Sequence, residues 1–170
     1  MKIKNKNGFS FIEVLISVFV LSIGITAAIT LMAGNIKNSI DSRDSIIASE
    51  LAQEGVELIR NVRDNNFLTN PEDVFNGFAN DDCIISYNSN LSCGGSLNYA
   101  LNYNSGYYTH SGGDATKFLR RINITSDPGG SGGKLVTSTT WWNGNSDPPV
   151  DCNMAAKCIY VENILTDWKN

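Results

Sequence analysis

The sequence predicts an α+β protein in which one long N-terminal helix packs on a small antiparallel β-sheet. Long aliphatic residues concentrate in residues 9–34, where Glu13 is the only charged residue, and apolar residues continue beyond them at helical spacing. From Phe67 onward, short β-prone runs alternate with clusters of Gly, Asn, Ser and Pro, which indicates strands joined by turns. The 170 residues are enough for one domain and a helical arm.

The first half of the expected helix is long enough to cross a membrane. Residues 14–36 carry no charge, and as a helix they would extend about 35 Å, against a hydrocarbon layer of about 30 Å. The segment is apolar on nearly every face, so its expected partners are lipid or other buried helices. Lys2, Lys4 and Lys6 precede it without an acid, which places the N-terminus in the cytoplasm and the rest of the chain outside.

Residues 37–66 are expected to continue the helix in amphipathic form. One face is predicted from apolar residues at intervals of 4, 7, 4, 7 and 4, namely Ile36, Ile40, Ile47, Leu51, Leu58 and Val62. The opposite face is expected to be solvated and carries Asp41, Asp44, Glu50, Glu54, Glu57, Arg60 and Arg63. Gly55 is expected to weaken this helix by roughly 1 kcal/mol relative to Ala.

Residues 67–170 are expected to form a β-rich domain outside the membrane. Strands are predicted at residues 83–87, 98–103, 117–126, 134–142 and 158–165. The alternation in the third of these places Phe118, Arg120, Ile122 and Ile124 on one face. The glycine-rich segment 127–133 is expected to be a hairpin loop. A phosphate cradle is not expected there, because neither a Lys-Ser or Lys-Thr pair nor a helix start follows it.

Two adjacent tryptophans, Trp141 and Trp142, are expected to lie on opposite faces of the sheet. We expect one of them to pack on the long helix. Exposure of the other, together with Tyr107 and Tyr108, would provide a surface for adhesion or for binding a carbohydrate.

All four cysteines, Cys83, Cys93, Cys152 and Cys158, lie after the apolar segment. Four cysteines outside the membrane fit two disulfides in an oxidising compartment. Three pairings are possible, of which the two local ones, Cys83–Cys93 and Cys152–Cys158, are the simplest. A zinc site is not favoured, because the chain contains no C-x-x-C pair.

No catalytic residue, metal site or cofactor is expected, so the chain is not expected to be an enzyme. His110 is the only histidine and is expected to be exposed in a glycine-rich loop, where no catalytic triad can be assembled around it. The acidic residues Asp81, Asp82, Asp147 and Asp151 lack the ordered spacing of a calcium loop. A net charge of −6 beyond the apolar segment argues against nucleic-acid binding through bulk charge.

Glu13 is the residue that discriminates between interpretations of the N-terminal segment. A carboxylate in an apolar span costs roughly 2.5–3.5 kcal/mol at mid-membrane and less near the edge, so it marks a functional hypothesis. A cut after Gly8 would make Phe9 a new N-terminus, whose amine lies four residues before Glu13 in a helix start that favours an acid. The alternatives are a plain membrane anchor and an ordinary secretory signal cleaved near residues 26–28.

The segment Lys6-Asn7-Gly8-Phe9-Ser10-Phe11-Ile12-Glu13-Val14-Leu15-Ile16 resembles the prepilin cleavage and methylation motif. Residues 18–34 and 51–64 resemble minor pilins of the PilV type. The resemblance implies the pilin fold, cleavage after Gly8 by prepilin peptidase, N-methylation of Phe9, and pairing of Glu13 with a neighbouring subunit's amine. Many major pilins carry a proline in the middle of this helix; here there is none, and Gly24 is only a mild weak point.

The expected protein is therefore a structural subunit, a minor pilin, of a type IV pilus-like filament or fimbrium. Its expected parts are a leader (1–8), a transmembrane and assembly helix (9–36), an amphipathic continuation (37–66) and an extracytoplasmic domain (67–170). Its expected partners are other pilin subunits, prepilin peptidase and the cytoplasmic membrane, which it spans once before it enters an extracellular pilus. Alternatives are a pseudopilin of a type II secretion system and a secreted binding domain behind an ordinary signal peptide.

Overall fold

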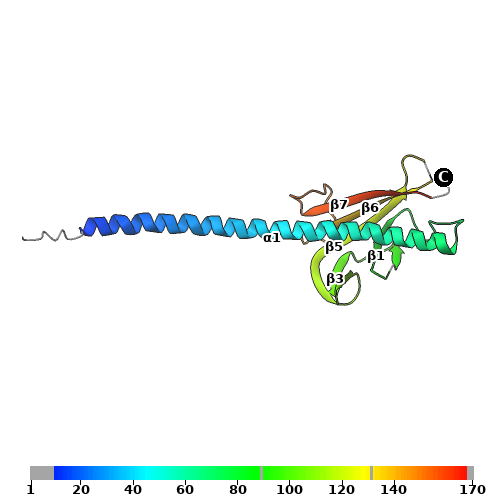
Figure 1. The fold of residues 1–170 in the computed structure, drawn as a ribbon, viewed down its shortest axis with the longest axis horizontal. Coiled ribbons are helices and arrows are strands. Elements are labelled where there is room, and N and C mark those ends of the chain that lie inside the picture. The colour runs from blue at the N-terminus through cyan, green and yellow to red at the C-terminus, as the bar shows by residue number, and fades with distance from the viewer. Residues whose placement is uncertain (1–9, 89, 131, 168–170) are drawn as a thin grey trace, which may run out of the picture. The chain divides into compact units, whose positions relative to one another are not determined.

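The computed structural model describes residues 10–88, 90–130 and 132–167. The chain divides into two compact units, residues 1–43 and 44–170. The elements in chain order are α1 (Phe11–Thr69), β1 (Asp82–Ile85), β2 (Leu91–Cys93), β3 (Ala100–Asn104), β4 (Tyr107–Thr109), β5 (Asp114–Ser126), β6 (Lys134–Trp141) and β7 (Cys158–Leu165) (Figure 1).

Helix α1 is 59 residues long and begins directly after Ser10. The Ser10 carbonyl accepts hydrogen bonds from the backbone N–H of Glu13 at 3.0 Å and of Val14 at 3.3 Å, which closes the first turn. The helix continues through Gly24 without interruption and ends at Thr69, three residues beyond the expected end. Pro71 follows shortly after and cannot continue the helix.

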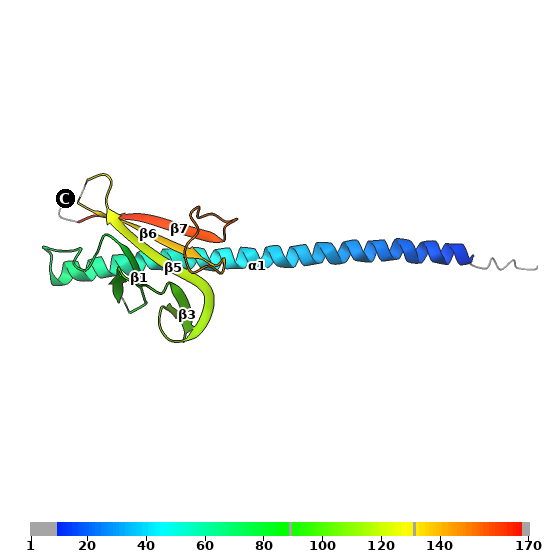
Figure 2. The ribbon, with the colours of Figure 1, turned by 180° about the vertical axis from the view of Figure 1, so that it is seen from behind.

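The seven strands found among the described residues form one antiparallel sheet around the long strand β5. Along one edge, β5 pairs with β6 from Leu119↔Trp141 to Ser126↔Lys134, and β6 pairs with β7. The other edge of β5 is shared by β1 and β3, which carry β2 and β4 as their hairpin partners. In Figures 1 and 2, β5 runs obliquely across the second half of α1. The α+β fold class expected from the sequence is confirmed.

The five expected strands correspond to β1, β3, β5, β6 and β7, and the loop at residues 127–133 joins β5 to β6 as the expected hairpin. The sequence interpretation missed β2 and β4. Each has only three residues, too few for a period of two to stand out, and each exists because a longer neighbour pairs with it.

The second unit has a core between its part of α1 and the sheet. One cluster gathers Ile59 with Cys83, Ile85, Ile122, Ile124, Val136 and Leu165; a second gathers Ala48 and Leu51 with Leu101, Phe118 and Trp142. The helix-facing residues of β5 therefore include Phe118, Ile122 and Ile124, as their alternation predicted. Burial of these side chains is the main force that holds the helix against the sheet.

The helix face that packs on the sheet differs from the expected apolar stripe. Leu51 is buried as expected, whereas Leu58 and Val62 are only half-buried and Ile36 and Ile40 are exposed. The centre of the buried face is made instead of small residues, Ala48, Ala52 and Gly55, together with Val56 and Ile59. Small residues were invisible to a search for large apolar ones, yet they let the helix approach the strands closely.

Gly55 marks the point of closest approach. A Cβ placed on it would lie 2.4 Å from Ser138 Oγ, 2.8 Å from Ile122 Cδ1 and 3.2 Å from Arg120 Cδ. The expected helix weakness at this position is therefore also a packing requirement, because no side chain has room between α1, β5 and β6.

The polar face of the helix is not entirely solvated, which corrects the sequence interpretation. Asp44 is buried and forms an ion pair with Lys117 of β5, and Arg63 is also buried. Glu54 pairs at 3.0 Å with Arg120, whose side chain is fully buried on the same strand face as Ile122. The buried guanidinium also donates to the backbone oxygens of Leu51 at 3.0 Å and Ile85 at 2.8 Å, so it joins α1, β1 and β5.

Trp141 and Trp142 are both buried, so neither of them provides the exposed tryptophan expected for an adhesive surface. Trp142 packs with Ala48, Leu51 and Phe118 on the helix side. The Trp141 side chain contacts the Tyr99 ring at a centroid distance of 5.8 Å, and its Nε1 donates to the Asn145 oxygen at 2.9 Å. The loop that follows β6 therefore covers Trp141. The strand pattern predicted only the face on which each tryptophan lies, not what packs over it.

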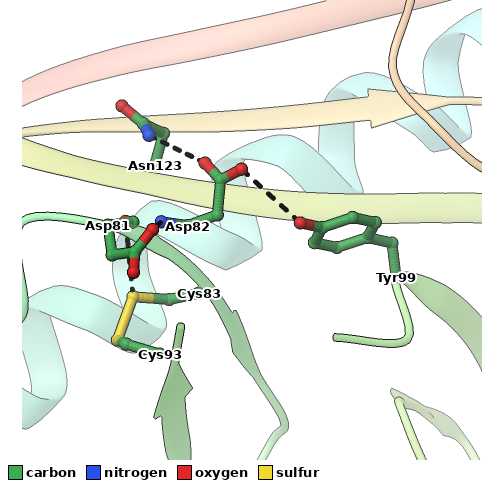
Figure 3. The surroundings of a disulfide bond; sticks show 6 residues. All are labelled: Asp81, Asp82, Cys83, Cys93, Tyr99 and Asn123. Atoms are coloured by element: carbon green, nitrogen blue, oxygen red, sulfur yellow. Dashed lines mark hydrogen bonds between the residues drawn. A yellow bond between two sulfur atoms is a disulfide. The ribbon is translucent and has the colours of Figure 1, made fainter. Parts of the chain in front are cut away.

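The cysteines form the two local disulfides, Cys83–Cys93 and Cys152–Cys158. Cys83 and Cys93 lie directly opposite each other on β1 and β2, so the first disulfide cross-links the β1–β2 hairpin (Figure 3). The second closes the turn that leads into β7.

Candidate functional site

Glu13 is the charged residue of the N-terminal segment that the structure describes. It is exposed in the first turn of α1, where the unpaired backbone N–H groups and the helix dipole favour a carboxylate. The expected processing residues, Gly8 and Phe9, lie outside the described residues. The described part of the site is therefore a helix start that carries one acid, directly after the position at which a cut would expose an amine.

The apolar part of α1 is not covered by any described residue of its own unit. Every residue from 11 to 40 is exposed, including Phe19, Leu21, Ile29 and Leu31. Among the described residues, α1 is long and apolar enough to cross a membrane, by length and composition. So large an apolar area calls for lipid or protein around it, because a water-exposed surface of this kind is a recognised interaction site.

The hydroxyl side chains of this segment are satisfied by the helix itself. Ser17 donates to the Glu13 carbonyl at 2.7 Å, Ser22 to Phe19, Thr26 to Ser22, and Thr30 to Thr26 and Ala27 at 2.9 Å. A polar group in hydrocarbon costs several kcal/mol unless it finds a hydrogen-bond partner. The sequence interpretation passed over these residues, although Ser or Thr within an apolar helix is itself a signal for bonding to the preceding turn.

Residues 3–29 match the family model of the prokaryotic N-terminal methylation motif. The matched range includes Gly8, Phe9, Glu13 and the first part of α1. This motif indicates a protein of the type IV pilin-like or pseudopilin class, and the apolar helix fits a membrane-anchored prepilin. No curated protein and no solved structure matches the chain.

His110 is buried, contrary to the expected exposed loop position. It directly follows β4, and its backbone N–H donates to Ser86 Oγ at 3.3 Å. Burial, and then the nearby Arg120 guanidinium, lower the pKa of His110 from 6.5 to about 4, while the backbone of Asn98 and Ala100 acts in the opposite direction. The imidazole is therefore neutral at pH 7 and is a core group of the second unit.

Asp82 is the acceptor of a polar cluster on the sheet face away from the helix. Figure 3 shows its carboxylate between Asn123 and Tyr99. It accepts hydrogen bonds from Asn123 Nδ2 at 2.8 Å, Tyr99 Oη at 3.5 Å and Arg121 Nη1 at 3.4 Å. Burial, and then the Asp82 charge, raise the pKa of Tyr99. The cluster ties β1 to β5 and leaves Asp82 engaged, not open to a cation.

The remaining acidic candidates of the outer domain, Asp81, Asp147 and Asp151, form no metal-holding group with other described residues. Within residues 10–88, 90–130 and 132–167, no group of three His, Cys, Asp or Glu side chains is placed to hold a metal ion. Tyr87 stacks on Tyr107 with ring centroids 3.7 Å apart, and Tyr103 contacts Tyr108 edge to face. Tyr103 and Tyr108 therefore pack across the β3–β4 hairpin, and Tyr87, which follows β1, packs on β4.

Proposed function

We propose that this protein is a structural subunit, a minor pilin, of a type IV pilus-like filament. The methylation motif at residues 3–29 carries the proposal. The architecture supports it, since the helix that carries the second part of the motif continues as the helix on which the sheet of the outer domain packs, and that domain contains two disulfides. In this proposal the domain is the part presented to the outside, and the apolar segment is the part that assembles.

The first step of the proposed assembly is processing. Prepilin peptidase cleaves the bond between Gly8 and Phe9, and Phe9 then carries the N-terminal amine and its methyl group. The leader with Lys2, Lys4 and Lys6 stays on the cytoplasmic side of the membrane. Cleavage removes three positive charges and leaves one amine next to an apolar helix.

The second step is charge pairing inside a bundle of apolar helices. The Glu13 carboxylate of one subunit pairs with the Phe9 amine of a neighbour, which removes both charges from an apolar environment at once. Opposite charges interact far more strongly at low dielectric than in water, and an unpaired charge there is very costly. The pairing therefore favours the correct axial stagger of neighbouring subunits over other staggers.

The third step is helix packing. The exposed aliphatic residues of α1 lose contact with lipid and gain contact with neighbouring helices. The hydroxyls of Ser17, Ser22, Thr26 and Thr30 keep their bonds to the preceding turn and so need no external partner. The apolar surface is compatible with both environments, as transfer from membrane to filament requires.

The decisive experiment replaces the carboxylate. Glu13→Ala and Glu13→Leu are expected to abolish incorporation into sheared surface filaments, while the outer domain stays folded and disulfide-bonded in the membrane fraction. Glu50→Ala, which removes an exposed acid of α1 in the second unit, is the matched control and should assemble normally. Normal filament levels of the Glu13 variants would refute the proposed pairing.

Mass spectrometry of the mature N-terminus tests processing separately. The proposal requires a chain that begins with N-methylated Phe9. A chain that keeps its lysine-bearing leader, or one that begins near residue 29, would support a plain anchor or a secreted domain instead. A pseudopilin would pass this test, so it is distinguished by the absence of extended filaments when the chain is expressed with its own assembly system.

A further inference from the structure

The sheet face away from α1 carries a polar hollow with a volume of about 600 Å³. Its floor is made by three adjacent strands, and one wall is the segment from Pro148 to Asn153, which the Cys152–Cys158 disulfide closes. Volumes of this order are typical of small-ligand sites. The hollow belongs entirely to the second unit and is independent of the assembly segment.

The floor is a row of side chains in register. Arg121 of β5 pairs with Thr139 of β6, and Thr139 pairs with Tyr160 of β7. Residues that lie opposite each other on neighbouring strands share a face and are close neighbours. Two strand spacings of about 4.8 Å make this row about 10 Å long, close to the length of two sugar rings. The next row places Thr137 beside it, where its hydroxyl donates to Glu162 at 3.1 Å.

The row presents three different kinds of contact. Arg121 gives a guanidinium whose Nη1 donates to Asp82, while its Nε is buried and forms no hydrogen bond within the described part of the chain. Thr139 gives a hydroxyl at the centre, and Tyr160 gives a half-exposed aromatic ring at the far end. The wall adds the carboxylate of Asp151 and the side chain of Asn153.

These charges select the class of ligand. An anion would be attracted by Arg121 but repelled by Asp82 and Asp151, and a cation would meet the guanidinium on the floor. An apolar ligand would cover the Arg121 guanidinium and the Thr139 hydroxyl without offering either a hydrogen-bond partner, which is costly. A neutral ligand with many hydroxyls satisfies donors and acceptors together, and its ring CH groups pack on Tyr160.

We propose that the row Arg121–Thr139–Tyr160 binds a neutral oligosaccharide of two or three rings. One ring lies on the Tyr160 side chain, and the hydroxyls of the next ring bond to Thr139 and Arg121. Asp82 of β1, the strand beside β5 at the Arg121 end of the row, accepts a hydrogen bond from Arg121 and keeps the guanidinium in place for the ligand.

The test uses the full-length chain in a phosphocholine detergent, because detergents with sugar headgroups would compete. Saturation-transfer NMR is recorded with cellotriose, maltotriose and chitotriose, and with sialyllactose as the anionic comparison. At least one neutral trisaccharide is expected to bind with a dissociation constant of about 1 mM or tighter. No signal from any neutral trisaccharide at about 10 mM, or binding of sialyllactose alone, would overturn the proposal.

Variants locate the binding. Tyr160→Ala is expected to weaken binding about tenfold, because it removes the ring contact. Thr139→Val keeps the shape of the buried position and removes only the hydroxyl, so it tests the same row even if Tyr160→Ala folds poorly. Tyr103→Ala and Thr125→Val, which lie outside the hollow, are matched controls and should bind normally. Equal binding by Thr139→Val and by its control would place the saccharide elsewhere and refute the assignment.

Discussion

Gly55 offers a prediction whose sign separates packing from helix propensity. An exposed helical glycine gains roughly 1 kcal/mol of stability when it is replaced by alanine. At Gly55 the new methyl group would overlap two atoms of the sheet, at 2.4 Å from Ser138 Oγ and 2.8 Å from Ile122 Cδ1. Gly55→Ala is therefore expected to destabilise the second unit despite the better helix former.

The magnitude follows from the two opposing effects. Overpacking a filled core costs typically about 1–3 kcal/mol, and the propensity gain offsets roughly 1 kcal/mol of that. Because two of the contacts are shorter than 3.0 Å, we take the overpacking cost at about 2–3 kcal/mol, which leaves a net loss of about 1–2 kcal/mol for Gly55→Ala. Gly55→Val adds two further methyl groups and a β-branched residue, so its expected loss is about 3 kcal/mol or more.

The assay is urea unfolding of the full-length chain in detergent, followed by the fluorescence of the buried Trp141 and Trp142.

Removing the Ser138 hydroxyl, the group nearest to the new methyl, should restore stability to Gly55→Ala. Ser138 Oγ is buried without a hydrogen bond in the described structure, so Ser138→Ala alone is expected to be nearly neutral. The pair Gly55→Ala/Ser138→Ala should recover about 1 kcal/mol of coupling energy.

Two outcomes would contradict this reasoning. A stability gain of about 1 kcal/mol for Gly55→Ala would mean that the helix does not approach β5 and β6 as closely as described. Simple additivity of the two substitutions would mean that Ser138 is not the group that resists the methyl. Gln53→Ala, at an exposed position of the same helix, is the control for effects of propensity alone.

Two further predictions concern buried ionisable side chains in the second unit. The pKa of His110 is lowered to about 4, so folding favours the neutral imidazole; its contribution is complete above pH 6.5 and is lost as the pH falls from 6.5 to 4. His110→Gln should remove about 3 kcal/mol of pH-dependent stability in that window. The measurement is the urea midpoint of the wild type and of the variant at each pH. Identical pH profiles would refute the assignment of this pH dependence to His110. Arg120→Met leaves the carbonyls of Leu51 and Ile85 without their donor and should lower the free energy of unfolding by about 3–5 kcal/mol. Arg60→Met, at a surface pair with Glu57, is the control and should lower it by under about 1 kcal/mol. Comparable losses of stability for the two variants in a thermal melt would show that the contribution of Arg120 does not come from its burial.

Much of the outer fold was accessible from local patterns. The alternation of Phe118, Ile122 and Ile124 predicted the central strand and its buried face, because side chains alternate across a strand whatever surrounds it. The glycine-rich segment 127–133 predicted the hairpin, since few other residues adopt its turns. The two local disulfides were the simplest of three pairings, and strand pairing brought Cys83 opposite Cys93.

Residues whose role depends on a distant partner escaped these patterns. Asp44 and Glu54 looked like surface acids, and only the register of β5 under the helix places Lys117 and Arg120 against them. His110 looked like a loop histidine until the β3–β4 hairpin folded it against the core. A sequence pattern depends on the type and spacing of residues, whereas the burial of a side chain depends on the elements that pack over it.

The amino-acid order alone determined the character of the N-terminal segment. This character follows from the motif, from the single acid at position 13 and from the length of the uncharged run. None of these depends on a tertiary contact, because the ability of a helix to cross lipid is set by the residues that follow one another along it. The tertiary structure decided how the rest of the helix meets the sheet and which side chains line the polar hollow. Those arrangements join residues that are about 20 to 80 positions apart, and only the paired strands and the close approach at Gly55 bring them together.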